Sequence, residues 1–392
     1  MGGSSGNVGG SSGSVGGSAG NVGGSAVNVG GSSQDGGFPY ALERVGTIMT
    51  PAEGNPLEAE GVLNPASGRG PDGKLYLLPR IVATGNVSRV GLARVVVTDG
   101  VPTGVEREGV VLEPETTWEI AEGNAGVEDP RVTWVEALGR HVMTYVAFGP
   151  LGPRTAIATS TDLRTWTRHG PVVYRWDPTA PPDSRADLNL FHNKDTVFFP
   201  EPVTAPDGTE SLAVLHRPMG MLRPFQGDDP VRATPPGPVE ERQSIWISFV
   251  PLEAALADPG ALTVWHGHRW LVGPEMAWEQ LKIGGGPPPL RVPEGWLLLH
   301  HGVTGVIDES RAQQQQVRYV AGGIILDADE PWLVINRSSE PLLEPSTEAE
   351  TTGIVPNVVF PTAVEEIDGA QYVFYGMADS AIGVARLTRR NP

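Results

Sequence analysis

The stretch GRHVMTYVAF (residues 139–148), followed by RTAIATS (154–160), is the pattern that decides the fold. The first run is apolar and rich in β-branched and aromatic residues, and the second combines small and β-branched residues; both compositions are typical of β-strands. Gly and Pro residues separate the two runs. The pair therefore predicts a two-strand unit.

The same two-strand unit occurs five times. The first runs read GKLYLLPR (73–80), GRHVMTYVAF (139–148), TESLAVLHRP (209–218), EGWLLLHHGV (294–303) and GAQYVFYGMA (369–378). The second runs read SRVGLARVVV, RTAIATS, QSIWISFV, RYVAGGIIL and AIGVARL. A four-stranded propeller blade with long loops occupies a comparable stretch, so we predict an all-β, five-bladed β-propeller over residues 38–392. A two-sheet sandwich is the alternative, but five repeats of one strand pair fit radial repetition better.

Two local patterns fit the blade interpretation. Residues 251–256 (PLEAAL) form the one convincing helical run, and Thr161–Trp166 predicts a tight turn closed by an indole. Such aromatic residues pack between blades, so most of the ten tryptophans are expected in the core.

Residues 1–37 form a separate low-complexity tail. Its repeats, such as GGSSGNV and GGSAGNV, place a valine at every seventh position (Val8, Val15, Val22 and Val29). Glycine is a poor helix former, so the composition is that of a flexible linker. The regular spacing favours a second interpretation, in which residues 2–36 pack against copies of themselves and drive homo-oligomerisation, in the extreme case into a filament.

Composition excludes several classes of function. The 392 residues are 39% hydrophobic and carry a formal net charge of −18, which argues against nucleic-acid and acidic-lipid partners. There is no cysteine, so disulfides and thiolate chemistry are excluded. No apolar run is long enough to span a membrane and the N-terminus does not read as a signal peptide. We expect a cytoplasmic protein by default, or an extracellular one if the tail serves surface assembly.

Residues 126–131 (GVEDPR) place two carboxylates beside a proline and an arginine, ahead of an apolar strand. The proline favours extended geometry for Asp129, while Glu128 and Arg131 push the pKa of Asp129 in opposite directions. A carboxyl group held in this way can act as an acid. The alternative is an ordinary strand-entry turn with a surface Glu–Arg pair.

The repeated strands end on polar residues: Arg80, the pair His216 and Arg217, the pair His300 and His301, and Asp379 just beyond the last strand. In a propeller, such ends converge on one funnel. Five cationic residues at these ends and nearby then predict an anion site: Arg89, Lys194, Arg217, Lys282 and His301. Solvated surface charges or salt bridges between blades are the alternative for each of them.

Metal and nucleotide sites are not expected. His216, His300 and His301 do not have the spacing of a zinc motif, and adjacent strand residues face opposite sides. The run Gly284–Gly286 lacks the following helix of a phosphate-binding loop, so it predicts only a turn with close backbone approach. We predict no cofactor.

Several further motifs accompany GVEDPR: Asn193-Lys194-Asp195, His216-Arg217-Pro218, residues 282–289 (KIGGGPPP), His301-Gly302-Val303, residues 355–361 (VPNVVFP) and residues 375–379 (YGMAD). Together they resemble glycoside hydrolase family 130, the β-mannoside phosphorylases, from about residue 60 to the end of the chain. The resemblance implies a five-bladed propeller that cleaves β-mannosides with inorganic phosphate as co-substrate, inverts the anomeric centre and releases α-mannose 1-phosphate.

The resemblance also implies roles for individual residues. Asp129 is the general acid, acting through a sugar hydroxyl as a relay. The implied phosphate site consists of Asn193, Lys194, Arg217, Lys282, His301 and Tyr319. The implied substrate-binding residues are Asn64, Arg89, Glu128, Asp195 and Asp379. His192 departs from the family pattern, which has an arginine there, and extra segments at 176–190, 222–242 and 305–316 leave the acceptor sugar open.

Charge separates the two enzymatic alternatives. An inverting hydrolase needs a second carboxylate as base, for which Glu201 and Glu279 are candidates, whereas a phosphorylase needs cations that hold phosphate in line with the anomeric carbon. The retained cations favour phosphorolysis over an inverting β-mannosidase. A non-catalytic, sugar-binding or self-assembling propeller is the third interpretation.

Overall fold

The computed structural model describes residues 37–121, 125–178, 187–221, 242–308 and 314–390. These residues belong to one compact unit, Gly36–Pro392. The predicted tail and parts of the three extra segments lie outside the described residues. β-Strands are the predominant regular structure of the described part, which confirms the all-β prediction.

The strands divide into five groups in chain order, and within each group the long strands pair antiparallel. The first and second groups are joined into one eight-stranded sheet by a short parallel pairing of Val87 with Ala125 and Ser88 with Gly126, and the other three groups are separate sheets. The first contains β2 (Gly61–Arg69), β3 (Leu75–Ala83), β4 (Val87–Thr98) and β5 (Val101–Leu112). The second contains β6 (Ala125–Val135), β7 (Arg140–Gly149), β8 (Gly152–Ser160) and β9 (Thr167–Pro171). The third contains β11 (Phe191–Phe198), β13 (Glu210–Met221), β14 (Ile245–Pro251) and β15 (Val264–Val272), with the short β10 (Val173–Tyr174) and β12 (Val203–Thr204) at its margins.

The fourth group contains β16 (Lys282–Gly285), β18 (Gly295–Gly305), β19 (Val317–Leu326) and β20 (Val334–Arg337), with β17 (Leu290–Val292) beside β18. The fifth contains β21 (Val359–Ile367), β22 (Ala370–Met377), β23 (Ala381–Arg389) and, from the start of the described chain, β1 (Tyr40–Met49). The described ranges also contain two short α-helices, α1 (Leu252–Ala257) and α2 (Glu348–Thr351), and short 3-10 helices at Pro56–Glu58, Glu136–Leu138, Leu188–Leu190, Pro259–Thr263 and Ala277–Glu279. Within the described ranges no helix has the length and apolarity to cross a membrane.

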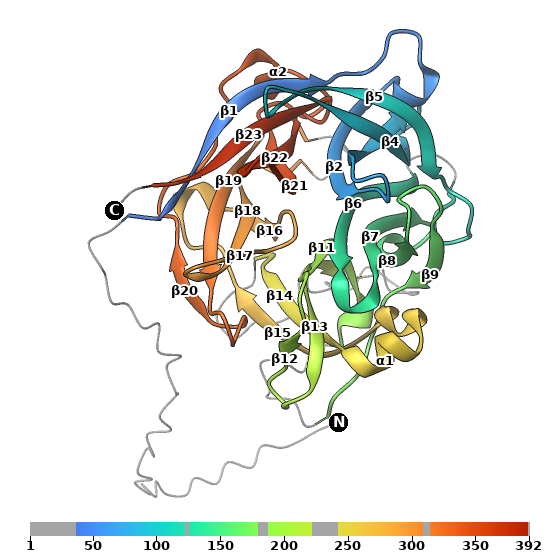
Figure 1. Cartoon of the computed structure of the whole chain (residues 1–392), viewed down its shortest axis with the longest axis vertical. Coiled ribbons are helices and arrows are strands. Elements are labelled where there is room, and N and C mark those ends of the chain that lie inside the picture. Colours follow the sequence, from blue (N-terminus) through green and yellow to red (C-terminus); the bar gives the residue numbers. More distant parts are fainter. Residues whose placement is uncertain (1–36, 122–124, 179–186, 222–241, 309–313, 391–392) are drawn as a thin grey trace, which may run out of the picture. The chain divides into compact units, whose positions relative to one another are not determined.

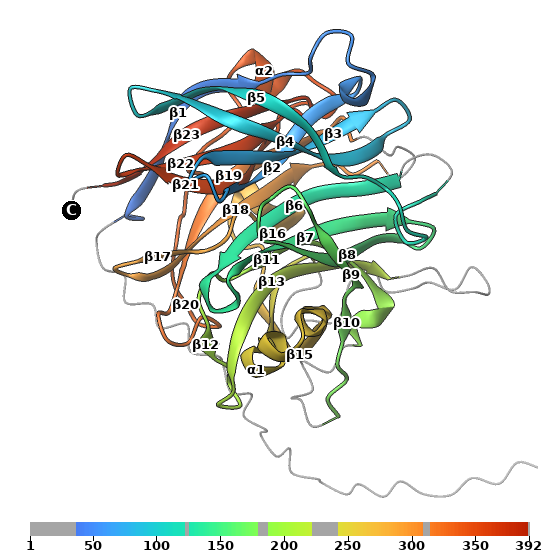
Figure 2. The same ribbon diagram turned by 45° about the vertical axis from the view of Figure 1, so that its right-hand side comes forward.

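The five groups follow one another around a common centre, with β2, β6, β11, β16 and β21 nearest to it (Figure 1). Figure 2 shows the second group between the first and the third. Five apolar clusters fill the spaces between neighbouring groups: first and second, second and third, third and fourth, fourth and fifth, and fifth and first. The core is therefore divided among the interfaces, and each group buries both of its faces.

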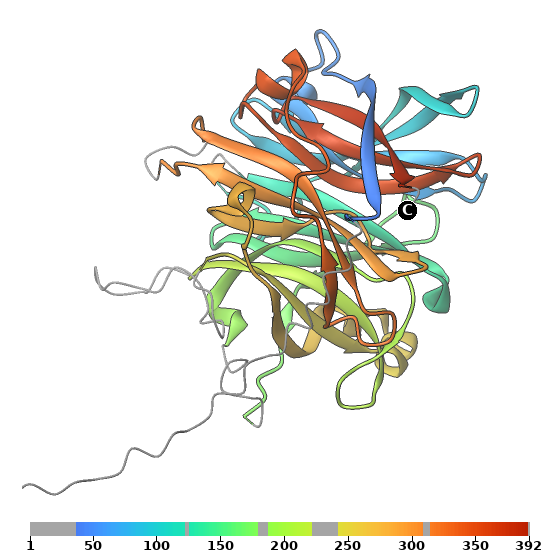
Figure 3. The ribbon, with the colours of Figure 1, turned by 90° about the vertical axis from the view of Figure 1, so that its left-hand side faces the viewer.

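Strand β1 completes the fifth group by pairing with β23, the last strand of the chain. In Figure 3 it is the blue strand beside the red ones. Tyr40 and Leu42 of β1 enter the cluster between the fourth and fifth groups, and Ile48 and Met49 enter the cluster between the fifth and first. The two ends of the described chain thus meet in one sheet.

The repeated strand pairs of the sequence correspond to β3–β4, β7–β8, β13–β14, β18–β19 and β22–β23, the middle strands of the five groups. The helical run appears as α1, and the predicted turn is closed by a hydrogen bond from Trp166 Nε1 to the carbonyl of Leu163 at 3.0 Å. Trp166 packs between the first and second groups, as expected.

Candidate active site

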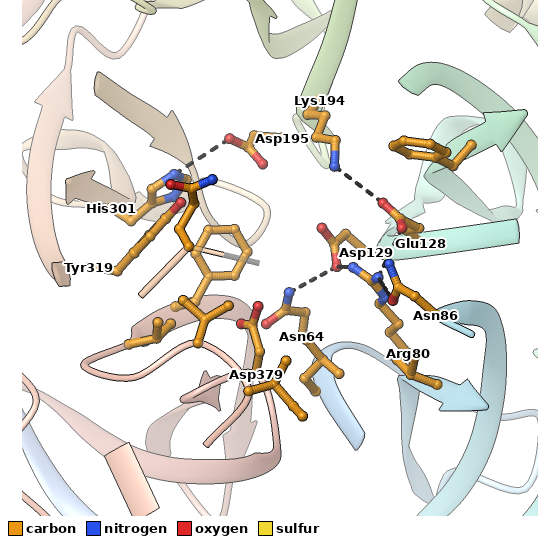
Figure 4. A pocket seen from close by; sticks show the side chains of 18 of the residues that line it. Asn64, Arg80, Asn86, Glu128, Asp129, Lys194, Asp195, His301, Tyr319 and Asp379 are labelled. Carbon is orange, nitrogen blue, oxygen red and sulfur yellow. Dashed lines mark hydrogen bonds and ion pairs between the residues drawn. The ribbon is translucent and has the colours of Figure 1, made fainter. Parts of the chain in front are cut away.

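A cavity of about 420 Å³ receives residues from all five groups (Figure 4). Its polar lining consists of Glu60, Asn64, Arg80, Asn86, Glu128, Asp129, Lys194, Asp195, Arg217, Lys282, His301, Gln314, Tyr319 and Asp379. Its apolar lining consists of Leu63, Val82, Phe148, Met219, Ile354, Val355, Val358 and Phe360. Its volume lies in the range of small-molecule sites, and convergent charged groups together with apolar residues are what an oriented polar substrate requires.

Five of the polar lining residues have left-handed backbone: Asn64 (φ 42°), Asn86 (φ 54°), Asp129 (φ 45°), Asp195 (φ 53°) and Asp379 (φ 51°). Three of them lie at register shifts in the innermost strands β2, β6 and β11. The extended geometry expected for Asp129 is therefore wrong, because the bulge overrides the preference of a residue before proline. Asp and Asn tolerate this conformation better than other side chains, and such strained residues cluster at functional sites.

Asp129 lies at the centre of a hydrogen-bonded set. Its Oδ1 accepts from Asn64 Nδ2 at 2.9 Å and from Arg80 Nη1 at 3.2 Å. Burial alone would raise the pKa of Asp129, but the positive charges of Arg80 and Lys194 outweigh it and hold the pKa below the usual value. The carboxylate is thus ionised in the unliganded cavity.

Glu128 bridges two cations. Its Oε1 accepts from Arg80 Nη2 at 2.9 Å, and its Oε2 accepts from Lys194 Nζ at 3.2 Å. Both oxygens are therefore occupied. Desolvation alone would lower the pKa of the buried Lys194 ammonium, but the negative charges of Glu128 and Asp129 outweigh it and raise that pKa. The geometry makes Glu128 a residue that holds Arg80 and Lys194 rather than one with an oxygen free for sugar.

Asp379 has the opposite electrostatic environment to Asp129. Burial, with the negative charges of Asp129 and Glu128, raises the pKa of Asp379 to about 6 in spite of the nearby Arg80. The two environments separate the pKa values of these carboxyl groups. At neutral pH Asp129 is ionised, whereas Asp379 is close to protonation. Such a separation is typical of sites that carry out acid–base chemistry.

Asp195 organises the anion-binding half of the cavity. Its Oδ2 accepts from Arg217 Nε at 2.6 Å and lies 3.5 Å from His301 Nε2. Arg217 also donates to Gln243. Burial lowers the pKa of His301 well below the usual value, so this imidazole is neutral. Neither ring nitrogen of His301 has a hydrogen-bond partner in the described part of the chain.

Lys282 and Tyr319 complete this half. Lys282 Nζ lies 5.5 Å from the centre of the Tyr319 ring, and it forms no ion pair with any carboxylate of the described ranges. Burial, with the positive charges of Arg217 and Lys194, lowers the pKa of Lys282 to about 7. Figure 4 shows His301 and Tyr319 on the side of the cavity opposite Asp129. An unpaired ammonium and a neutral imidazole without partners are groups that an anion can engage.

Two predicted site residues do not line the cavity. Arg89 points to Glu113, with 3.5 Å between Nε and Oε2, because neighbouring strand residues face opposite sides. Asn193 is 2% exposed and faces the interior, where its Nδ2 lies 3.0 Å from His216 Nδ1. The remaining predicted residues all line the cavity. His192 lies beside the carbonyl of Pro153, outside the cavity lining.

Four polar lining residues were not among the predicted site residues: Glu60, Arg80, Asn86 and Gln314. Arg80 takes the place expected for Arg89, and its Nη2 lies 3.3 Å from Asn86 Oδ1. Glu60 accepts from the backbone N of Asn86 at 2.9 Å and so fixes the turn that carries this amide. Arg80 ends its predicted strand as Arg217 does, and that signal would have been sufficient to assign it.

The carboxylates considered as bases for hydrolysis lie elsewhere. Glu201 is exposed outside the cavity. Glu279 is buried beneath the fourth group, where its Oε1 lies 2.8 Å from His300 Nε2 and its Oε2 pairs with Arg337. Among the described residues no three His, Asp or Glu side chains form a metal-binding group.

The family model described as beta-1,4-mannooligosaccharide phosphorylase, glycoside hydrolase family 130, matches residues 64–214 and 253–391. This chain belongs to glycoside hydrolase family 130. The matched segments include Asp129, Lys282 and His301, whereas Arg217 lies between them. The family match therefore includes lining residues from both halves of the cavity.

Two bacterial phosphorylases are similar to the chain over most of its length. A 1,2-beta-oligomannan phosphorylase from Thermoanaerobacter sp. (strain X514) is 29% identical over 355 residues, covering 88% of this chain and 95% of the relative. A beta-1,2-mannobiose phosphorylase from the same organism is 30% identical over 288 residues, covering 72% and 74%. The structure of the Listeria innocua beta-1,2-mannobiose phosphorylase in complex with beta-1,2-mannobiose superposes with a TM-score of 0.64 and 21% identity, covering 90% of this chain and 97% of that one. That structure shares the fold.

Proposed function

We infer that this protein is a glycoside phosphorylase that cleaves β-mannosides with inorganic phosphate. Family membership and relatives named as mannoside phosphorylases support this activity. The geometric observation that carries it is the division of the cavity. Asp129 lies on one side and His301 and Tyr319 lie on the other (Figure 4), with the unpaired Lys282 Nζ 5.5 Å from the centre of the Tyr319 ring. Phosphate is the co-substrate, and no cofactor is required.

The division fits inversion at the anomeric carbon. A mannosyl unit between the two sides presents its leaving oxygen to Asp129 while phosphate attacks from the Lys282 side, which gives α-mannose 1-phosphate. Phosphate is already an anionic nucleophile, so no second carboxylate is needed to deprotonate it. Asp129 delivers its proton through a hydroxyl of the mannosyl unit. Asn64, Asp195 and Asp379 are positioned to bind that unit.

Binding of phosphate also prepares the acid. In the unliganded cavity, cations hold the pKa of Asp129 low. A phosphate anion that engages Lys194 and Lys282 compensates these charges and thereby raises the pKa of Asp129, so the carboxyl group takes up its proton as the second substrate binds. Protonation of the acid and loading of the nucleophile are then coupled.

The arrangement of the sheets supports the finer fold assignment. Five four-stranded groups around one centre, with an apolar cluster at each of five interfaces, are the expected anatomy of a closed five-bladed β-propeller. We assign residues 38–392 to this catalytic propeller. The cavity lies where the innermost strands converge.

The test of function is an incubation with β-1,2- and β-1,4-mannobiose, with and without inorganic phosphate. We expect phosphate-dependent cleavage, with α-mannose 1-phosphate identified by phosphorus and proton NMR. Asp129→Asn keeps the shape of the side chain but cannot donate a proton, so turnover is expected to fall by about 10²- to 10⁴-fold with unchanged thermal unfolding. Equal cleavage without phosphate would indicate an inverting β-mannosidase, and near-normal turnover of Asp129→Asn would remove the acid assignment.

The repeat segment at residues 2–36 supports a second proposal, which concerns assembly. Its valine at every seventh position suits packing against copies of the same segment. We propose that it joins the catalytic units into homo-oligomers, up to an open filament.

A further inference from the structure

Arg131 is a buried cation that neither the predicted chemistry nor a salt bridge uses. Its side chain ranks among the largest fully buried ones, at 1% exposure, directly after Asp129 and Pro130. It forms no ion pair with any carboxylate of the described residues, and its Nη2 has no hydrogen-bond partner among them. Burying a guanidinium without a paired carboxylate is unfavourable, so its presence needs an explanation.

The hydrogen bonds of Arg131 go to three backbone carbonyls. Nη1 donates to the carbonyls of Asp129 and Pro130, both at 3.2 Å, and Nε donates to the carbonyl of Gly286 at 3.0 Å. Asp129 and Pro130 lie in the register shift of β6, where β7 offers them no paired residue. The guanidinium thus supplies the donors that the strand ladder lacks at the bulge.

The same guanidinium reaches the anion-binding half. Gly286 directly follows β16, the strand that begins with Lys282. The Arg131 Cζ lies 5.4 Å from the centre of the Phe360 ring, and that ring lies 4.4 Å from the ring of His301. One side chain therefore contacts the bulge that carries Asp129, the strand that carries Lys282 and the ring that supports His301.

We propose that Arg131 is a positioning residue that locks the left-handed bulge carrying Asp129 and fixes its distance from the phosphate-binding strand. A lysine reaches one carbonyl at a time, whereas the planar fork of arginine serves several at once, which accounts for the residue type. The proposal deepens the proposed function and rests on Asp129 as the acid. It adds an electrostatic effect, because the positive charge of Arg131 lowers the pKa of both Asp129 and Asp195.

The test compares two donors in Arg131→Met, Arg131→Lys and Asp129→Asn. Mannobiose needs a protonated leaving group, whereas 2,4-dinitrophenyl β-mannoside does not. We expect kcat for mannobiose to fall by about 10²-fold in Arg131→Met, the effect of a misplaced acid, and kcat for the activated donor to fall by less than about 3-fold. The alkaline limb of kcat for mannobiose at saturating phosphate, which reports the loaded enzyme, should move to higher pH, because losing the positive charge raises the pKa of Asp129.

Arg131→Lys keeps the charge but loses the fork. We expect its alkaline limb to stay in place while kcat for mannobiose falls, and this variant carries the test if Arg131→Met does not fold. Arg168→Met is the matched control from the same strand group. It removes a guanidinium that pairs with Glu115 and Glu119 away from the cavity. Its kcat per folded molecule should match wild type.

Equal losses on both donors with an unmoved alkaline limb would show that Arg131 serves stability alone, and would overturn the proposal. Failure of the proposed function has a different signature: Asp129→Asn would then retain turnover of mannobiose, whatever Arg131→Met does.

Discussion

Lys282 shows how a single charge can set the working range of the site. It is the cavity cation with no carboxylate partner in the described ranges, and burial beside Arg217 lowers its pKa to about 7. Below that pH the free enzyme presents a desolvated ammonium to phosphate, and above it a neutral amine. A lysine that is paired, as Lys194 is with Glu128, stays charged across this range.

Lys282→Arg tests this dependence, because arginine stays charged at every accessible pH. We expect wild-type kcat/KM for phosphate, divided by that of Lys282→Arg, to fall by about tenfold per pH unit above about pH 7. The ionisation of phosphate itself affects both enzymes and cancels in the ratio. KM for the mannoside should change much less, since the charge acts on the anion. A ratio that stays constant from pH 6 to 9 would rule out a role for Lys282 ionisation.

The sequence motifs predicted most of the residues that line the cavity. The prediction failed at positions where the local backbone geometry decides which way a side chain points. His301 and Arg217 enter the cavity while their neighbours His300 and His216 turn into the core, as alternation along a strand requires. The prediction that Arg89 lines the cavity is wrong because of the same alternation along a strand. The left-handed conformation of Asp129 could not be read from the sequence, because it depends on a bulge relative to a partner strand.

At the scale of elements, the innermost strands carry the candidate catalytic and binding residues. They are also the strands that could not be recognised from the sequence pattern. The middle strands are continuous apolar runs because both faces are buried between groups, so their pattern is easily recognised. Strands β2, β6 and β11 are interrupted by bulges and polar residues such as Asn64, Asp129 and Asp195. Because these strands carry functional polar residues, they lack the apolar periodicity by which strands are identified in a sequence.

Strand β16 illustrates the close approach predicted for its glycine run, although it is a strand and not a turn. An alanine Cβ at position 284 would lie 2.5 Å from His301 Cε1 and closer still to Asp195 Oδ2. At position 285 the nearest atom would be the carbonyl oxygen of Asp195 at 3.3 Å. Both glycines have ordinary backbone conformations, so they differ mainly in what a methyl group would displace.

Gly284→Ala is therefore expected to impair the phosphate half selectively. It must push Asp195 or His301 out of place, so kcat/KM for phosphate should fall by about 10²-fold. Gly285→Ala is the matched control and should lose less than about 5-fold, because its neighbour needs to move only a few tenths of an ångström. Circular dichroism and thermal unfolding check that both variants fold. Equal activity of the two variants would contradict the packing argument.

At the scale of the whole molecule, the sequence repeats predicted five units but not how the first and last strands of the described chain are joined. The pairing of β1 with β23 joins the two ends of the described chain, and it places residues of β1 in the two apolar clusters that flank the fifth group. No local pattern marks Tyr40–Met49 as the partner of a strand more than 300 residues later in the chain. This pairing depends on the fold of the complete chain, since an unpaired β23 would leave an open sheet edge.

Strand β1 begins at Tyr40, so residues 2–36 precede the strand that completes the fifth group. Removing these residues should therefore leave the catalytic unit complete. A variant that starts at Gly37 is therefore expected to keep kcat and both KM values within about twofold of the full chain, since no lining residue of the cavity is lost. Under the assembly proposal, light scattering and negative-stain images should show large particles for the full chain and small ones for the variant. Replacing Val8, Val15, Val22 and Val29 by serine in the full chain tests whether the repeated apolar position drives assembly, at unchanged length. Small, discrete particles of the same size for all three proteins would mean that the segment is only a linker.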